Sequence, residues 1–429
     1  MKTEEKPYTF VSARNTCKMC TPLGAALAAK GIIGAITLLH GSQGCSTYIR
    51  RYMISHFREP IDIASSNFSE EAAIFGGKDN LITAIKNVVG QYHPEVLIIA
   101  TTCLSETIGD DLPMIIKQAQ TALGPDLPPL VHVSTPSYRG VSGTGFHDTV
   151  AAIVKAFAKK GPTIEHRVGL FPGIVSCEDL REFNRIGSEC GITPVIVSDY
   201  SETLDGGLWS EHIAIPEGGT DIAEIATLGS VRSSITCGAI SDGANRAGSF
   251  LEKNFGVQKH VVTLPIGIEN TDCFLAALTA HGGAVSARLK KERARLADAY
   301  VDGHKYVFGK RVVICADDDL AESLKSFVLE IGMIPVVVAK IGEDADHAKV
   351  LEAATAEKAE IILGSSKALF VKRALNIPLV RVGLPIHDRI GGQRVLTVGY
   401  RGTIRLFDEI VNTIMEERQD AREQGFTYI

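Results

Sequence analysis

The chain has 429 residues, a length that predicts about three domains when one domain takes roughly 150 residues. Hydrophobic residues make up 45% of the chain and charged residues 22%, proportions that exclude a disordered or fibrous protein. A net charge of -6 supplies no attractive field for a polyanion, so nucleic acid and acidic membranes are excluded as default partners.

The nine cysteines are spread over the whole chain, and its start has no apolar run of the signal-peptide kind. This predicts a cytoplasmic, reducing location, where clustered thiols are more often metal ligands or catalytic groups than disulfides. The longest apolar stretch near the start, Gly31–Leu39, is far shorter than the roughly 20 residues that cross a bilayer. No membrane segment is predicted.

Three segments repeat one pattern, in which a short β-branched run is followed by an amphipathic stretch and a second apolar run. The predicted strand, helix and strand are Glu95–Ala100, Leu112–Leu123 and Leu130–Val133 in the first segment; Arg167–Phe171, Glu178–Cys190 and Pro194–Val197 in the second; and Arg311–Cys315, Asp318–Ile331 and Pro335–Ala339 in the third, with further strands at Glu360–Leu363 and Pro378–Val382. Because parallel strands need a covering crossover, the pattern predicts an α/β fold with three doubly wound parallel-sheet domains.

The predicted domains are residues 1–160, 161–284 and 285–429, separated at the seam Lys159–Pro162 and at a charged helix. That helix, Val285–Gly303, mixes both charge signs with Leu and Ala, a pattern typical of a solvated connector. A last helix over Phe407–Arg418 is expected to follow a turn at Tyr400–Gly402.

The motifs of nucleotide-binding proteins and serine hydrolases are missing. Gly76–Asp79 lacks the upstream glycine and the following hydroxyl of a phosphate-binding loop. Gly140–Gly145 follows a proline-containing loop and has no acidic residue after it in the right context for a dinucleotide site. Gly41–Gly44 is not the G-x-S-x-G elbow of a hydrolase. We therefore expect no ATP site, no NAD site and no serine triad.

Three cysteines lie in glycine-rich or turn-like segments of the first predicted domain. Cys20 precedes Thr-Pro-Leu-Gly, Cys45 ends His-Gly-Ser-Gln-Gly-Cys, and Cys103 follows the predicted strand Glu95–Ala100. Ligands of open parallel sheets lie beyond the carboxyl ends of strands, and thiolates bind iron and iron-sulfur clusters. The three cysteines are therefore a candidate half-site. By its spacing alone, Cys17-x-x-Cys20 fits a redox pair or a zinc half-site equally well.

The remaining cysteines are expected to be small hydrophobic residues of the core: Cys177, Cys190, Cys237, Cys273 and Cys315. Most of the twelve histidines stand alone and are expected to be hydrogen-bonded scaffold residues. His387, in Pro-Ile-His-Asp-Arg, is kept as a functional candidate.

Short motifs extend over nearly the whole chain. They are Cys20-Thr-Pro-Leu-Gly, His40-Gly-Ser-Gln-Gly-Cys45, His56-Phe-Arg-Glu-Pro60, Glu71–Gly77, Thr101–Asp111, Ser134–Tyr138, Pro265–Asp272, Asp302–Tyr306 and Asp388–Gly392. Each motif alone is weak evidence for any family, but the motifs together are specific for one. It resembles the nitrogenase component 1 superfamily, most strongly its β-type subunits.

The resemblance implies three Rossmann-like domains and a heterotetramer of two α-type and two β-type subunits. In this family three cysteines from each subunit meet at the interface and hold an iron-sulfur cluster, the 8Fe-7S P-cluster in the reductases. Cys20, Cys45 and Cys103 match those positions. Ser137 matches a serine that can join the oxidised cluster, although a turn hydroxyl explains it equally well. Cys17 is an added thiol, which leaves the ligand beside it open.

Phe75, in Ile-Phe-Gly-Gly, matches an exposed aromatic residue against which the ATP-hydrolysing iron protein docks in this family. A Phe between an acidic run and two glycines suits a transient docking surface, and a core position is the alternative. The active-site cofactor belongs to the α-type subunit, so no catalytic residue is expected in this chain.

Two functions follow from the resemblance. The first is the β-type subunit of a nitrogenase-like reductase, which relays electrons from the iron protein through the interfacial cluster to a cofactor in the α-type subunit. Because few residues precede Cys20, an enzyme such as a methylthio-alkane reductase is favoured over nitrogenase itself. The alternative is the β-like half of the scaffold that assembles the iron-molybdenum cofactor. Such halves often keep only the cysteine of Gly-Ser-Gln-Gly-Cys and bind a 4Fe-4S centre, so three cysteines favour the reductase.

Overall fold

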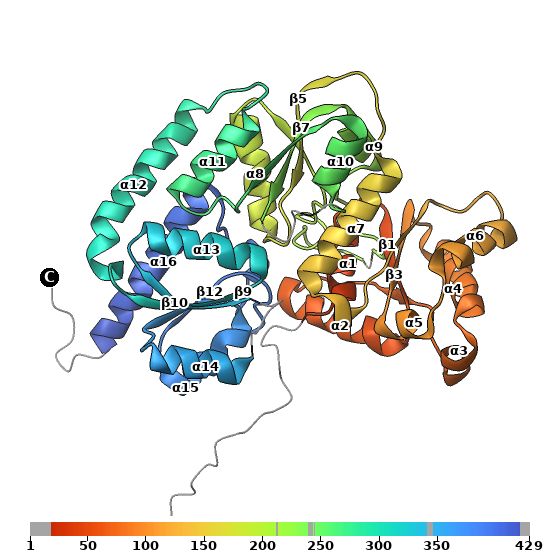
Figure 1. Ribbon diagram of the computed structural model, residues 1–429, viewed down its shortest axis with the longest axis horizontal. Helices are drawn as coiled ribbons and strands as arrows, with labels where there is room; N and C mark the ends of the chain where they lie inside the picture. Colours follow the sequence, from red (N-terminus) through yellow and green to blue (C-terminus); the bar gives the residue numbers. More distant parts are fainter. Residues whose placement is uncertain (1–18, 212, 239–242, 244, 341–345, 421–429) are drawn as a thin grey trace, which may run out of the picture.

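Three parallel sheets form the framework of the molecule. The computed structural model describes residues 19–211, 213–238, 243, 245–340 and 346–420. Its three sheets each have four strands, all parallel, and lie in three lobes that helices join (Figure 1). The predicted α/β class with three doubly wound parallel sheets is confirmed.

The first sheet takes its strands from the N-terminal third of the chain. Its order is β2-β1-β3-β4, with β1 (Ala35–His40), β2 (Ala64–Ser65), β3 (Val96–Thr101) and β4 (Leu130–Val133). The covering helices are α4 (Lys78–Tyr92) and α6 (Leu112–Leu123) on one face and α1 (Thr21–Lys30) and α7 (Ser142–Phe157) on the other. β1 and β3 are buried along their whole length, which explains their nearly continuous apolar sequences.

The second sheet has the order β6-β5-β7-β8. Its strands are β5 (Ile164–Phe171), β6 (Thr193–Ile196), β7 (Val231–Cys237) and β8 (Gln258–Val262), and its helices are α8 (Cys177–Glu189), α9 (Ile222–Ala226), α10 (Ala247–Phe255) and α11 (Ile268–Leu278). The sequence pattern predicts β5 and β6 but not the other two strands. β7 buries Ser233, Ser234 and Thr236, so hydroxyl side chains interrupt its apolar run.

The third sheet has the order β10-β9-β11-β12. Its elements are β9 (Arg311–Ala316), α13 (Asp318–Glu330), β10 (Ile334–Lys340), α14 (His347–Ala356), β11 (Ile361–Gly364), α15 (Leu369–Leu375) and β12 (Leu379–Arg381). The four strands and α13 lie where the apolar runs predict them.

All three sheets share one strand order, in which the first and third strands of each segment are neighbours. The crevice beside such a pair is the topological switch point at which open α/β sheets bind ligands. Each sheet falls within one of the three predicted domain ranges, and the boundaries themselves stay a prediction. One continuous apolar core joins residues of all three sheets. In the described part of the chain, no helix is both long and apolar enough to cross a membrane.

Two long helices differ from their predicted form. α12 (Ala287–Val307) is not only a solvated connector, because it packs along α16 and buries Glu292 in an ion pair with Arg185 of α8 at 2.8 Å. α16 (Gly399–Asp420) begins well before the predicted start, so Tyr400–Gly402 is helical and not a turn. A Cβ on Gly402 would lie 2.4 Å from the Thr397 carbonyl carbon, so this glycine serves close packing.

Candidate metal centre

Cys45 and Cys103 lie at the switch point of the first sheet. Cys45 is in the first turn of α2 (Gln43–Phe57), which follows β1, and Cys103 is the first residue of α5 (Cys103–Ile108), which follows β3. β1 and β3 are adjacent and parallel, with His40 paired to Thr101 at their ends. Both cysteines therefore emerge at the sheet edge where ligands are bound in this architecture.

Two turns approach closely to bring these cysteines together. A Cβ on Gly41 would come to 2.1 Å from the Thr102 hydroxyl oxygen, so only glycine fits at this position. The N–H and the hydroxyl of Thr102 both donate to the His40 carbonyl oxygen, at 3.2 and 3.0 Å. The turn before Cys45 is thereby fixed against the turn before Cys103.

Cys20 reaches the same region from a helix that covers the sheet. It is the N-cap residue of α1, and the N–H of Ser142, at the start of α7, donates to the Met19 carbonyl at 2.9 Å. A Cβ on Gly24 would lie 1.8 Å from the Ser142 carbonyl oxygen, so glycine lets α1 lie directly on α7. The packing of these two helices therefore sets the position of Cys20.

The three thiols are close enough to affect one another electrostatically. Burial raises the pKa of Cys20 to about 11; the N–H of Leu23 opposes this shift, and the charges of Cys45 and Cys103 add to it. All three cysteines are free and half-buried. The Cys20 thiol is protonated at neutral pH, so metal binding there must displace a proton.

The surroundings of the thiols suit a negatively charged cluster. Each cysteine lies at the N-terminus of a helix, where unpaired N–H groups and the helix dipole favour negative charge. In addition, the Ser137 N–H donates to Cys103 Sγ at 3.2 Å, and hydrogen bonds to sulfur tune the potential of iron-sulfur clusters. These residues therefore fit one half of an iron-sulfur site.

These residues suit a single metal ion less well than an iron-sulfur cluster. Among the described residues, no three His, Cys, Asp or Glu side chains converge closely enough to hold one ion. Thiolates of a cluster bind different irons and need not converge on one point. The assignment of Cys20, Cys45, Cys103 and Ser137 as cluster ligands stays a prediction, and Cys17 lies outside the described residues.

The positions of Ser137 and of the cysteines outside the candidate site show which locations could be predicted from the sequence and which could not. Ser137 opens a 3-10 turn, η1 (Ser137–Arg139), and its amide N–H contacts the Cys103 thiol. The buried cysteines are, as expected, Cys177, Cys190, Cys237 and Cys315. Cys273 is exposed on α11, because that helix turns the neighbouring Phe274 and Leu275 inward, so its expected core position is wrong.

Phe75 ends α3 (Glu70–Phe75), a short helix that packs beside α5. Its side chain is 83% exposed and that of Ile74 is 74% exposed, so the core alternative for Phe75 is wrong. Its role in docking a partner stays a prediction.

Two residues of this region were given no role by sequence reasoning. The buried His40 ring and the Asp110 carboxylate form a hydrogen bond of 3.0 Å although they are 70 positions apart. Both lie inside motifs of the family resemblance, but nothing in the neighbouring sequence indicates that they meet.

His387, the histidine kept as a functional candidate, lies edge-on to Tyr52 of α2, with ring centroids 4.8 Å apart.

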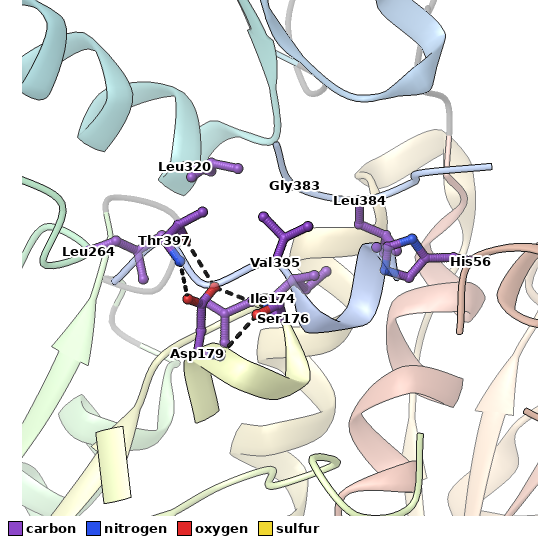
Figure 2. A pocket seen from close by; sticks show the side chains of 12 residues that line it. His56, Ile174, Ser176, Asp179, Leu264, Leu320, Gly383, Leu384, Val395 and Thr397 are labelled. Carbon is purple, nitrogen blue, oxygen red and sulfur yellow. Dashed lines mark hydrogen bonds between the residues drawn. The ribbon is translucent and has the colours of Figure 1, made fainter. Parts of the chain in front are cut away.

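A small cavity lies where helices and loops that flank the three sheets meet (Figure 2). Its volume of about 30 Å³ has room for about two water molecules, so it is too small for a cofactor. On its wall, the Asp179 carboxylate accepts a hydrogen bond from the Thr397 N–H at 2.7 Å (Figure 2). It also accepts one from the Val398 N–H at 3.0 Å. Burial raises the pKa of Asp179 and lowers that of His56 to about 3. These contacts join the sheets.

Comparisons with known proteins identify the family. Residues 20–340 and 338–415 match the nitrogenase component 1 type oxidoreductases. The chain is 34% identical to the nitrogenase molybdenum-iron protein beta chain of Clostridium pasteurianum, over 97% of its own length and 96% of that chain. The corresponding beta chain of Frankia alni is 36% identical, over 94% and 83%.

A solved structure of nitrogenase Cp1 at pH 6.5 superposes with a TM-score of 0.92 and 33% identity, covering 100% of this chain and 98% of the other. Sequence, strand arrangement and length thus agree from end to end. The chain belongs to the nitrogenase component 1 family, as a subunit of the β type.

Proposed function

We propose that this chain is the electron-relay subunit of a component 1 reductase, assembled with an α-type subunit in a heterotetramer of two α-type and two β-type chains. The observation that carries the proposal is the meeting of three half-buried thiols, Cys20, Cys45 and Cys103, at one edge of the first sheet. An iron-sulfur cluster bound there supplies one-electron transfer.

The number of thiols and their exposure support a shared site. Even a simple 4Fe-4S cluster takes about four thiolates, and the residues that the structure describes bring together three. Cys20 and Cys45 pack against the main core on one side, and their partial exposure leaves the other side open. The remaining ligands then come from the α-type subunit. Depending on their number, the cluster is an 8Fe-7S P-cluster or a 4Fe-4S centre.

We infer that an ATP-hydrolysing iron protein delivers the electrons by docking on α3. Ile74 and Phe75 form a small exposed apolar surface, with Glu70 and Glu71 in the first turn of the same helix. An aromatic anchor surrounded by charge suits a contact that must form and release. α3 packs beside α5, the helix that begins with Cys103, and this supports docking close to the thiols.

The choice between nitrogenase and a nitrogenase-like reductase is a separate question. The Clostridium beta chain is matched over 96% of its length, so the short start of this chain does not separate nitrogenase from a nitrogenase-like enzyme such as a methylthio-alkane reductase. The scaffold for iron-molybdenum cofactor assembly is the second candidate, since it too would hold a cluster between two related chains.

The iron content and the EPR signal of the purified complex test the proposal. We expect the anaerobically purified heterotetramer to contain about eight irons per α–β interface and to give the EPR signal of an oxidised P-cluster. Cys45→Ala should abolish that signal because it removes a central ligand. Cys273→Ala, which changes an exposed thiol on α11, is the matched control and should keep full iron content.

Two outcomes would contradict parts of this assignment, and a third would identify the kind of reductase. About four irons with a simple 4Fe-4S signal would favour the scaffold. Full cluster content in Cys45→Ala would refute the ligand set. Turnover of a thioether without dinitrogen reduction, by the complete enzyme with its iron protein, would identify a nitrogenase-like reductase, and the reverse would identify nitrogenase.

A further inference from the structure

A chain of hydrogen bonds leads from the exposed α3 into the first sheet. Gly76, with φ of 96°, ends α3 directly after Phe75, and Gly77 then caps α4. The Gly77 N–H donates to the Asp110 carboxylate, at 3.0 Å to one oxygen and 3.2 Å to the other. Asp110 lies just beyond the end of α5, whose first residue is Cys103.

Asp110 connects this turn to a buried histidine. Its carboxylate lies 3.0 Å from His40 Nε2, and His40 Nδ1 lies 3.0 Å from Ser66 Oγ. Burial lowers the pKa of His40, and the ring is therefore neutral. A carboxylate can only accept, so the single ring proton is on Nε2 and the Ser66 hydroxyl donates to Nδ1. Gly77, Asp110, His40 and Ser66 together form the His40 link.

The inner end of the His40 link holds both cysteine-bearing turns. Ser66 Oγ accepts the Gly41 N–H at 3.0 Å, in the turn before Cys45. The His40 carbonyl accepts two hydrogen bonds from Thr102, the residue before Cys103. A displacement of His40 therefore moves the backbone before both of these cysteines.

Packing leaves the His40 link little freedom to absorb a displacement. The Phe68 ring stands edge-on to the His40 ring, with centroids 4.7 Å apart. A Cβ on Gly77 would come to 2.2 Å from the far edge of the same Phe68 ring. Phe68 thus fills the space between Gly77 and His40, and close-packed interiors transmit strain.

We propose that the His40 link is a positioning device, which carries a displacement of the Phe75 turn to the backbone of Cys45 and Cys103 and so couples docking to electron entry. This inference rests on the proposed function, because it takes the iron protein as the partner of α3. The two glycines are the hinge, and Asp110, His40 and Phe68 act as the rigid part. None of these residues is a cluster ligand.

The test compares two electron donors to one heterotetramer. In Asp110→Asn, an amide N–H₂ or a weaker neutral acceptor faces the His40 N–H, and the acceptor to Gly77 loses its charge. We expect reduction of the cluster by the iron protein with ATP to slow about tenfold, a typical allosteric coupling. Reduction by dithionite, iron content and iron-protein affinity should stay within about twofold of wild type.

Asp111→Asn is the matched control, because Asp111 caps α6 next door and accepts from the Met114 N–H, outside the His40 link. Both donors should reduce the cluster of this variant as fast as they reduce the wild-type cluster. Phe68→Leu is a second variant that loosens the packing and removes no hydrogen bond of the His40 link. It should show the same selective slowing, and it decides the matter if Asp110→Asn fails to fold.

The inference is overturned if Asp110→Asn or, failing its folding, Phe68→Leu matches wild type with the iron protein, or if both donors slow equally. The proposed function fails in a different way. In that case the wild-type protein itself lacks the interfacial cluster, or its cluster accepts no electrons from any iron protein.

Discussion

The candidate site depends on single residues that the sequence reveals unequally. Cys20, Cys45 and Cys103 can be selected from glycine-rich segments and strand ends, because their chemistry is visible in the residue type. The contact of the Ser137 amide with Cys103 could not be predicted, since a backbone donor leaves no trace in the sequence. The His40–Asp110 pair is hidden by its separation of 70 positions.

A buried lysine offers a prediction at the residue scale. Lys30 ends α1 with 5% of its surface exposed, and its Nζ has no hydrogen-bond partner among the described residues. Burial lowers its pKa to about 8, against partial opposition from Asp62. The folded state therefore binds this proton more weakly than the unfolded state does, so stability should rise as pH increases from about 8 to about 10.5.

Lys30→Met should raise the free energy of unfolding by about 3 kcal/mol at pH 7, and the gain should shrink toward pH 10. Urea unfolding at both pH values measures this. The matched control is Lys86→Met, on the exposed side of α4, which should change little at either pH. A loss of stability in Lys30→Met at pH 7 would show that the Lys30 ammonium is well paired after all.

At the scale of elements, apolar runs predicted strands whose residues are buried on both faces, such as β3 and β9. The same reasoning missed β7, where buried hydroxyls replace apolar residues, and it misjudged α12. Charged residues on α12 suggested solvent, but Glu292 is 4% exposed because it meets Arg185 of another helix. Pairing between distant charges is invisible to a local pattern.

The position of Cys20 depends on how α1 packs across α7. Gly24→Ala would place a methyl group 1.8 Å from a backbone oxygen, which no rotamer change can relieve. We expect a loss of at least about 2 kcal/mol in the free energy of unfolding, together with reduced iron content. Urea unfolding and iron analysis of the heterotetramer test this.

Gly90→Ala provides the control for that substitution. Gly90 lies within α4, and a Cβ at this position would have no neighbouring atom within 4 Å, so alanine should stabilise the helix by up to about 1 kcal/mol. Equal effects of the two substitutions would mean that helix propensity, and not the approach of α1 to α7, governs Gly24.

At the scale of the whole molecule, three sheets could be counted from the sequence, but their mutual packing could not. The junction is made by residues far apart in the chain, as when Asp179 holds the backbone of Thr397 and Val398. No periodicity encodes such a contact. The boundaries proposed at 160 and 284 therefore rest on pattern alone.

His56 makes the junction sensitive to acid. Its Nδ1 accepts the Ile386 N–H at 2.9 Å, joining α2 to the loop after the third sheet, and its pKa of about 3 lies far below the ordinary 6.5. The unfolded chain therefore takes up a proton that the folded chain refuses. Stability from this group should be complete above pH 6.5 and fall as the pH drops toward 3, by up to about 5 kcal/mol.

His56→Asn keeps an acceptor for the Ile386 N–H but cannot titrate in this range. Its melting temperature should fall less steeply than that of wild type between pH 7 and pH 5. His132→Asn, on the exposed side of β4, is the comparison and should follow the wild-type curve. Parallel curves for all three proteins would rule out His56 as the acid-sensitive group.

The strand order common to the three sheets has a practical meaning for redesign. The shared strand order gives each sheet a switch point between its first and third strands, and among the described residues three cysteines gather at the first of these. Short loops, and not the strand order, therefore determine which edge gathers cysteines. New ligands grafted after β5 and β7, or after β9 and β11, would lie at the corresponding switch points and would leave unchanged the strands that build the shared core.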